Sequence, residues 1–314
     1  MPASPGCEDV TPKSSAGREG PGSTGGQLQS SRFSVVVHLD ADAFLARAWG
    51  WLMEREDEHN LLLGLAAHLS GPPPQVGQDG YLMVTVEEEG KVVGAAFRTP
   101  PHKAGFTRMP VEAAPEVARV LATRYSSIPA FFGPEDVVMA AGRAWAEARG
   151  VEPVAGMPQR IYRLDRVAPP TGVPGIMRPV SPEELPLVHL WADGFARDAG
   201  AGFATARETR ERWVAHGGLY FWEDGGAPVT MALATGKTDN GIRIGYVYTP
   251  RDHRRRGYAT ALVVALSQKA LDEGARFCVL YTDLTNPTSN AIYPRVGYRP
   301  LCDIVDVDLV TPGT

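Results

Sequence analysis

The sequence predicts an α/β (α+β) protein made of two halves with a similar order of elements. In both halves, apolar runs rich in β-branched residues alternate with stretches of helical periodicity. A segment dense in Pro and Gly, residues 168–175, separates the halves and is typical of a linker. Hydrophobic residues make up 44% and charged residues 21% of the 314 residues, which is ordinary for globular proteins.

These patterns predict four parts of the chain. Residues 1–31 are rich in Gly, Ser and Pro and contain no aromatic residue, so we expect a mobile tail without a catalytic part. Residues 32–167 form the first predicted domain, residues 168–175 the linker, and residues 176–314 the second domain.

The first half begins with a predicted strand at 33–39 and continues with one or two helices over 41–69. A hairpin follows, because two β-branched runs flank the turn Glu87-Glu88-Glu89-Gly90. The predicted elements from the hairpin onward are strands 81–86 and 92–97, helices 112–124 and 134–149, and strand 159–166.

The second half begins with a predicted strand at 176–180. Ser181, followed by Pro182 and two glutamates, indicates a capped helix start. The further predicted elements are a helix at 205–215, strands 219–223, 228–236 and 242–249, a helix opening near 260, a strand at 276–282 and a helix after 286.

The turn between the strand 242–249 and the next helix is unusual in its charge. Arg254, Arg255 and Arg256 stand where the helix dipole is positive, which costs from a few tenths to about 1 kcal/mol per cation. An anion bound to the free N–H groups of the helix start would remove this cost, and Gly257 would let its backbone approach such a ligand. We interpret the turn as a diphosphate-binding turn; the alternative is a solvated basic helix start.

A second motif lies downstream, where the strand 276–282 is followed by Asp283-Leu284-Thr285-Asn286-Pro287-Thr288-Ser289-Asn290. Thr285 or Asn286 is suited to cap the next helix, with Pro287 in its first turn and Gly297 as its stop. Pro294 is expected to end this helix early, because it removes an internal hydrogen bond.

The two motifs in this order, R-x-x-G-x-A and N-P-T-S-N-A-x-Y-x-x-x-G-Y, resemble the acyl-CoA-binding core of the GNAT superfamily of N-acetyltransferases. The resemblance covers about residues 176–309 and is strongest at 244–300. It implies a mixed, mostly antiparallel sheet flanked by helices, acetyl-CoA as co-substrate, and chemistry without a metal.

The resemblance also implies roles for individual residues. The main chain of Val247, Tyr248 and Thr249 would pair with the pantetheine arm. Tyr293 would protonate the leaving thiolate, although a core aromatic packed on the sheet is the alternative. The residues expected to contact the remainder of the coenzyme are Arg254, Arg255, Arg256, Gly257, Tyr258, Ala259, Thr260, Asn286 and Asn290.

The general base has no clear signature. Asp283, at the carboxyl end of its strand, is the nearest candidate, and a turn or cap residue is the alternative. A water relay would leave no trace in the sequence. Further acids on the substrate side are Asp193, Asp198, Glu223 and Asp224.

The first half contains neither motif, so we predict that it binds no coenzyme. We expect it to pack against the second half and to form one wall of the acceptor site. Its segment His38-Leu39-Asp40-Ala41-Asp42 resembles a metal-binding strand of lesion-bypass DNA polymerases. We expect Asp40 or Asp42 to cap the following helix instead.

Charge and composition limit the expected partners. The net charge of −5 argues against nucleic acid, and no apolar run reaches the roughly 18 residues of a membrane span. The three cysteines are scattered without metal-ligand spacing, and a cytoplasmic location is expected. The predicted acceptor is a small-molecule or peptide amine, the oligomeric state is left open, and the alternative function is a non-catalytic acyl-CoA-binding regulatory module.

Overall fold

The computed structural model describes residues 32–311 apart from 39, 72–79, 169–171 and 201–204, so the predicted tail 1–31 lies outside the described residues. The contacts group Phe33–Thr314 into one compact unit. Its first half contains β1 (Phe33–Val37), α1 (Ala41–Met53), α2 (Asn60–Leu69), β2 (Leu82–Glu88), β3 (Lys91–Arg98), β4 (Ala104–Phe106), α3 (Ala114–Arg124), β5 (Ala130–Gly133), α4 (Glu135–Arg149) and β6 (Glu152–Leu164).

The second half repeats this order of elements. After β7 come two helices, three strands, a helix, a strand, a helix and a last strand, as in the first half. Its elements are β7 (Ile176–Pro179), α5 (Leu185–Ala199), α6 (Arg207–Ala215), β8 (Leu219–Asp224), β9 (Ala227–Thr235), β10 (Gly241–Tyr248), α7 (Tyr258–Asp272), β11 (Phe277–Asp283), α8 (Pro287–Val296) and β12 (Arg299–Val310).

The twelve strands of the described residues belong to one sheet, in the order β1-β2-β3-β4-β5-β12-β6-β11-β10-β9-β8-β7. Parallel pairing occurs between β4 and β5 and between β10 and β11, and the other neighbours are antiparallel. The prediction of a mixed, mostly antiparallel sheet in two similar halves is confirmed.

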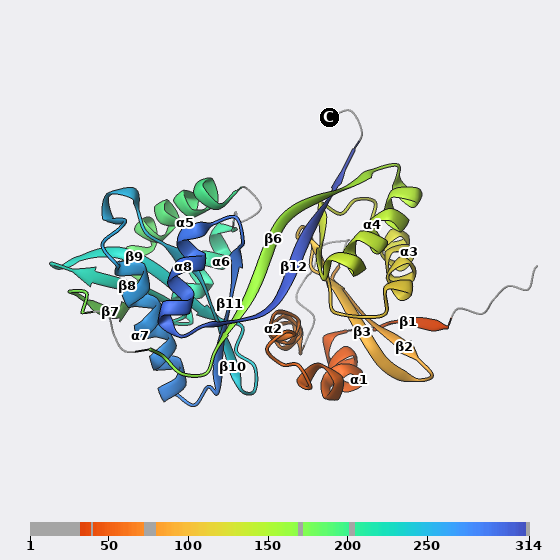
Figure 1. Ribbon diagram of the computed structural model, residues 1–314, viewed down its shortest axis with the longest axis horizontal. Coiled ribbons are helices and arrows are strands. Elements are labelled where there is room, and N and C mark those ends of the chain that lie inside the picture. The colour runs from red at the N-terminus through yellow and green to blue at the C-terminus, as the bar shows by residue number, and fades with distance from the viewer. Residues whose placement is uncertain (1–31, 39, 72–79, 169–171, 201–204, 312–314) are drawn as a thin grey trace, which may run out of the picture. The chain divides into compact units, whose positions relative to one another are not determined.

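The two halves exchange their last strands. Strand β6 pairs with β11 of the second half, and β12 pairs with β5 of the first half. In the middle, β6 and β12 lie side by side and pair along most of their length (Figure 1). Each half therefore takes core residues from the other: Tyr162 and Leu164 pack with α7, while Val305 and Val307 pack with α3 and α4.

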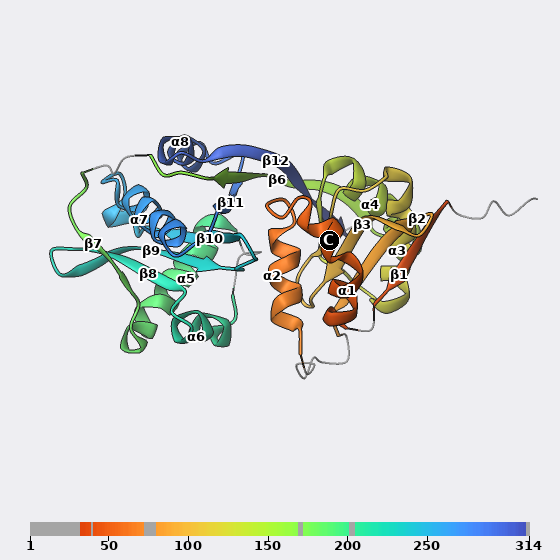
Figure 2. The same cartoon turned by 90° about the horizontal axis from the view of Figure 1, so that it is seen from below.

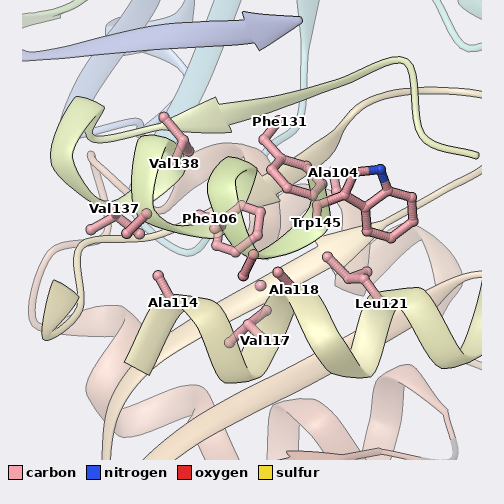
Figure 3. Close-up of a cluster of buried hydrophobic side chains, with 14 of the residues drawn as sticks. Ala104, Phe106, Ala114, Val117, Ala118, Leu121, Phe131, Val137, Val138 and Trp145 are labelled. Atoms are coloured by element: carbon pink, nitrogen blue, oxygen red, sulfur yellow. The ribbon is translucent and has the colours of Figure 1, made fainter. Parts of the chain in front are cut away.

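Helices cover both faces of the sheet. In the second half, α7 and α8 pack on one face and α5 and α6 on the other (Figure 2). In the first half, α1 and α2 form one cluster with the sheet, and α3 and α4 form another. Figure 3 shows the second of these clusters, in which the Phe131 and Trp145 rings meet edge to face at 5.8 Å.

Three expectations about elements need correction. Strand β6 begins at Glu152 rather than 159, because β12 pairs with residues on both sides of position 159. Strands β4 and β5 were not anticipated, since they have three and four residues and contain no β-branched side chain. Helix α8 does not end at Pro294 but continues to Val296, where Ile292, Tyr293 and Val296 pack against the sheet.

The expectation for the acidic segment near residue 40 is confirmed. Asp40 is the N-cap of α1, and its Oδ1 accepts a hydrogen bond of 2.7 Å from the Ala43 N–H. Asp42 accepts a bond from the Gly71 N–H. Among the described helices, none has the length and apolar character needed to cross a membrane.

Candidate active site

The two parallel strands β10 and β11 separate soon after they meet. They pair from Gly241 with Phe277 to Arg243 with Val279. Beyond this point β10 continues beside β9, and β11 continues beside β6 as far as Asp283. In the described part of the chain, the facing edges beyond Arg243 have no ladder partner. Their main-chain groups are therefore available to an extended ligand that adds to the strand edge.

A bulge lies in β10 at this separation. The register with β9 shifts between Gly245 and Tyr248, and Tyr246 has a φ of 53°. The side chains of Tyr246 and Tyr248 lie on the α5 and α6 face, whereas Val247 packs on the α7 face. A bulge next to a ligand site re-aims side chains in this way. The Tyr248 carbonyl is occupied, because it accepts a 2.8 Å bond from the Thr230 hydroxyl.

The turn after β10 contains a short 3-10 helix, Arg251–His253, and no side chain of the described residues caps the start of α7. Gly257 is the N-cap residue with a φ of 82°, and the first helical bond runs from the Ala261 N–H to its carbonyl. Arg255 also has a positive φ, 63°. The N–H groups of Tyr258, Ala259 and Thr260 therefore point out of the helix without an intrahelical partner, a geometry suited to anions.

The arginines of this turn divide into two kinds. Arg251 and Arg254 both form ion pairs with Asp198 on α5, and the Arg254 Nε donates to the Thr249 carbonyl at 2.9 Å. The hydrogen bond from Arg254 lowers the pKa of Asp198. Arg254 therefore holds the turn against α5, although its side chain is exposed like those of Arg255 and Arg256.

The other acids expected on the substrate side also have partners. Asp224 accepts a hydrogen bond from the Tyr258 hydroxyl, and this contact raises the pKa of Tyr258. Asp193 pairs with Arg210 at 2.8 Å, and Glu223 pairs with Arg178. These contacts give the acids structural roles.

The turn between β11 and α8 is built by two of the predicted site residues. The Asp283 carboxylate accepts bonds from the N–H and the hydroxyl of Thr285, at 2.7 Å each. The Asn290 amide donates to the carbonyls of Asp283, Leu284 and Asn286 at 3.0, 3.1 and 2.9 Å. Both side chains therefore hold the main chain around Asn286.

Tyr293 lies on α8, half-buried on the face that α7 covers. Its ring centroid is 6.1 Å from that of Tyr162 and 6.0 Å from that of Tyr298. Val247 and Tyr258 pack against the same cluster. The fold thus brings the end of β10, the start of α7 and Tyr293 to one face of the sheet.

The sequence did not indicate that Thr230 binds the main chain of β10 or that Asp198 holds the turn after β10. Thr230 lies 18 residues before the Tyr248 carbonyl that it binds, and Asp198 lies 56 residues before Arg254. Neither distance leaves a local pattern, so only the fold reveals these contacts.

The equivalent place in the first half is different. Strands β4 and β5 also pair in parallel, but a Cβ on Gly105 would lie 2.4 Å from the Phe97 ring and 2.7 Å from the Phe132 ring. Before α3 there is no glycine turn, and Glu112 and Glu116 stand at the helix start. In the first half, aromatic rings therefore lie beside the parallel strands, where the second half has separated strands. Acids precede α3, where the second half has the glycine turn before α7.

Comparison with known proteins agrees with this geometry. Residues 187–298 match the family model of the acetyltransferase (GNAT) family, a range that includes β10, the glycine turn and Tyr293. The match lies within the second half of the chain, and together with the fold it supports an acyl-transfer function.

Solved structures with similar folds span nearly the whole chain. A Drosophila protein is 14% identical, with a TM-score of 0.64 over 88% of this chain and 98% of its own. A GCN5-related N-acetyltransferase from Sphaerobacter thermophilus is 17% identical, with a TM-score of 0.57 over 91% and 98%. A tandem GNAT protein from the clavulanic acid biosynthesis pathway is 16% identical, with a TM-score of 0.50 over 90% and 99%. No curated protein sequence matches the chain. These likenesses show the GNAT fold.

Proposed function

We propose that this protein is an N-acetyltransferase that moves the acetyl group of acetyl-CoA directly to a primary amine. One observation carries the proposal: inside the GNAT match, β10 and β11 separate after three paired residues, and an uncapped glycine turn at Gly257 connects the end of β10 to α7. The separated strand edge can bind the extended pantetheine arm of the coenzyme, and the N–H groups of the turn can bind its phosphates.

In this proposal the main chain of Val247, Tyr248 and Thr249 binds the pantetheine arm. The N–H groups around Gly257, from Arg255 to Thr260, bind the diphosphate. Arg254 contributes by holding the turn to Asp198 and Thr249 rather than by contacting phosphate. Asn290 contributes by shaping the turn that presents Asn286.

The proposed reaction forms one bond and breaks one bond. The amine nitrogen attacks the thioester carbonyl carbon, the C–N bond forms, and the C–S bond breaks. Main-chain N–H groups of β10 near Val247 stabilise the negative oxygen of the intermediate. Tyr293 gives its proton to the departing thiolate, because a phenol of ordinary pKa near 10 is protonated at neutral pH. The ammonium proton of the acceptor leaves to Asp283 or to water.

The binding step is tested by calorimetry of the purified protein with acetyl-CoA and CoA. We expect heat of binding with a 1:1 stoichiometry. Release of CoA thiol in the presence of a panel of amines then tests turnover. Absence of any binding would remove the proposal, and binding without turnover would favour a regulatory module that senses acyl-CoA.

The acid role is tested by Tyr293→Phe. We expect kcat to fall by roughly 100-fold while the Kd for acetyl-CoA changes by less than about twofold, because the hydroxyl acts only as the bond breaks. Tyr298→Phe is the matched control: its ring belongs to the same cluster, but its hydroxyl bonds Ser267 at 2.9 Å. Equal kcat values for the two variants would contradict the role of Tyr293.

A further inference from the structure

Three polar side chains from both halves meet on the face of β10 and β11 opposite α7. Arg243 projects from β10, Tyr281 from β11, and Asn60 begins α2 of the first half. The Arg243 Nη1 donates to the Asn60 Oδ1 at 3.1 Å, and the Asn60 Nδ2 donates to the Tyr281 hydroxyl oxygen at 3.3 Å. We call this group the Arg243 cluster.

The Arg243 cluster has more donors than acceptors. The Asn60 oxygen is used by Arg243, and the Asn60 Nδ2 also donates to the Asp57 carbonyl at 2.7 Å. Burial raises the pKa of Tyr281 to about 12, so its hydroxyl keeps a proton to donate. The remaining N–H groups of Arg243 and the Tyr281 O–H find no protein acceptor within the described part of the chain.

Arg243 also has no acidic partner. Among the described residues, no carboxylate lies within 4.0 Å of its guanidinium, and burial lowers its pKa. The acids just before α2 are used elsewhere: Glu56 binds Asn240 at 2.7 Å, and Asp57 binds Arg163 at 2.7 Å. The Arg243 side chain is half-buried, so its guanidinium is partly desolvated and still accessible. A partly desolvated cation without a counter-charge attracts an anion that reaches it.

The cluster lies within reach of the proposed transfer site. Arg243 is four residues before Val247, which is about 13 Å along an extended strand. Between them, Gly245 projects toward the same face as Arg243, and a Cβ there would meet nothing within 4 Å. A pocket with Phe132 and Tyr281 in its lining reaches the cluster at Tyr281 from the side of the first half. Toward Val247, the open position at Gly245 leaves space beside β10.

We propose that the Arg243 cluster binds an anionic group of the acceptor, so that the substrate is an amine that also carries a carboxylate or a phosphate. This rests on the proposed acetyl transfer for the role of the amine. Arginine matches both anions because its planar N–H groups bond two oxygens at once, and Tyr281 adds a neutral donor. The acceptor is thus recognised at its anionic end by residues from both halves.

The experiment compares amines that differ only in charge at the far end. Glycine, β-alanine and γ-aminobutyrate are each paired with their primary amides, and aminoethyl phosphate separates phosphate from carboxylate. We expect KM to be roughly 10- to 100-fold lower for at least one anionic amine than for its neutral match, because hydrogen bonds to a charged group are strong. The spacer length that gives the lowest KM reports the distance between the anion-binding cluster and the place where the amine reacts.

Two variants assign this preference to the cluster. Arg243→Gln should raise KM for the preferred anionic amine roughly 10- to 100-fold, with kcat nearly unchanged and KM for the neutral amine unaffected. Asn60→Asp should act in the same direction, because it places a carboxylate on Arg243 at nearly unchanged size. Arg160→Gln is the control for charge, since Arg160 already pairs with Asp303.

The two proposals fail in different ways. Calorimetry of the coenzyme-free protein with the same amino acids measures the anion site without turnover. No acetyl-CoA binding would remove the acetyltransferase proposal, whereas intact acetyl-CoA binding with equal affinity for anionic and neutral amines would overturn the Arg243 cluster as their site. A preference that survives both Arg243→Gln and Asn60→Asp would overturn it as well.

Discussion

At the residue scale, the proposed phosphate-binding turn depends on Gly257. Its φ of 82° is strained for any residue with a Cβ, and a Cβ there would lie 2.9 Å from the Val173 Cγ2. Gly226, in the hairpin between β8 and β9, has a φ of 80° but open space around its Cβ position. The two glycines therefore share the backbone cost and differ in their surroundings.

This pair predicts different effects of the same substitution. Gly257→Ala should raise the Kd for acetyl-CoA at least roughly tenfold, because the turn must shift its N–H groups, and should cost about 1 kcal/mol of stability. Gly226→Ala should cost a similar stability and leave the Kd unchanged. Calorimetry and thermal unfolding of both variants provide the measurement, and equal Kd values would contradict a phosphate role for the turn.

His59 predicts a pH dependence of stability. It is 5% exposed, its Nδ1 lies 2.9 Å from the Leu52 carbonyl oxygen, and its ring stacks on Trp51 at 4.7 Å. Burial lowers its pKa below the usual value of 6.5. The unfolded chain therefore takes up a proton at a higher pH than the folded chain does, so stability is lost as the pH falls below about 6.5.

The substitution His59→Asn isolates this contribution, because the asparagine amide can replace the Nδ1 donor without titrating. The variant should lose stability at about pH 8, where the stacking on Trp51 is missing, and this deficit should shrink toward about pH 5.5. Thermal unfolding of both proteins across this range measures the difference. His38 and His189 also have lowered pKa values. Both are present in both proteins, so their contributions cancel in the difference in stability. A deficit that stays constant with pH would contradict the assignment.

At the scale of elements, the turn between β11 and α8 depends on Asn290. Its amide holds three carbonyls of the turn, so Asn290→Ala should cost about 1–3 kcal/mol in the free energy of unfolding. The loosened turn should also weaken acetyl-CoA binding. Gln268→Ala, which removes one exposed bond to Asp272 on α7, is the control and should cost less than about 0.5 kcal/mol. Denaturant unfolding measures both variants. Equal losses in the free energy of unfolding would contradict the role of Asn290 in holding the turn.

Most elements were predictable from local pattern, and those that were not share a cause. The hairpin of β2 and β3 and the capped start after Ser181 follow from turn and cap residues that act within a few positions. Strands β4 and β5 have no such pattern, because both are short and lack β-branched residues, and β5 depends on its pairing with the distant strand β12. The expectation that Pro294 ends α8 early was wrong for the same reason, because tertiary packing of α8 outweighs one missing hydrogen bond.

At the scale of the molecule, the exchange of β6 and β12 joins the two halves. Residues 172–314 alone would lack Tyr162 and Leu164, which are 3% and 0% exposed in the core under α7. Burial of such side chains contributes about 1.5–3 kcal/mol each, and the edge of β11 would also be left unpaired. We expect this fragment not to unfold cooperatively, and a peptide of residues 152–166 to restore a transition. A cooperative thermal transition of the fragment without the peptide would contradict this.

The sequence by itself determined the GNAT resemblance, the doubled order of elements and the sites of the two motifs. These features depend on residues close together in the chain, such as Gly257 after three arginines or Asn290 after Asp283. The tertiary structure alone decided which strands cross between the halves, that Asp198 binds Arg254, and that Asn60 meets Arg243 across 183 positions. The reason is physical: periodicity and capping act within one or two helical turns, whereas strand exchange and ion pairing depend on which surfaces the folded chain brings together.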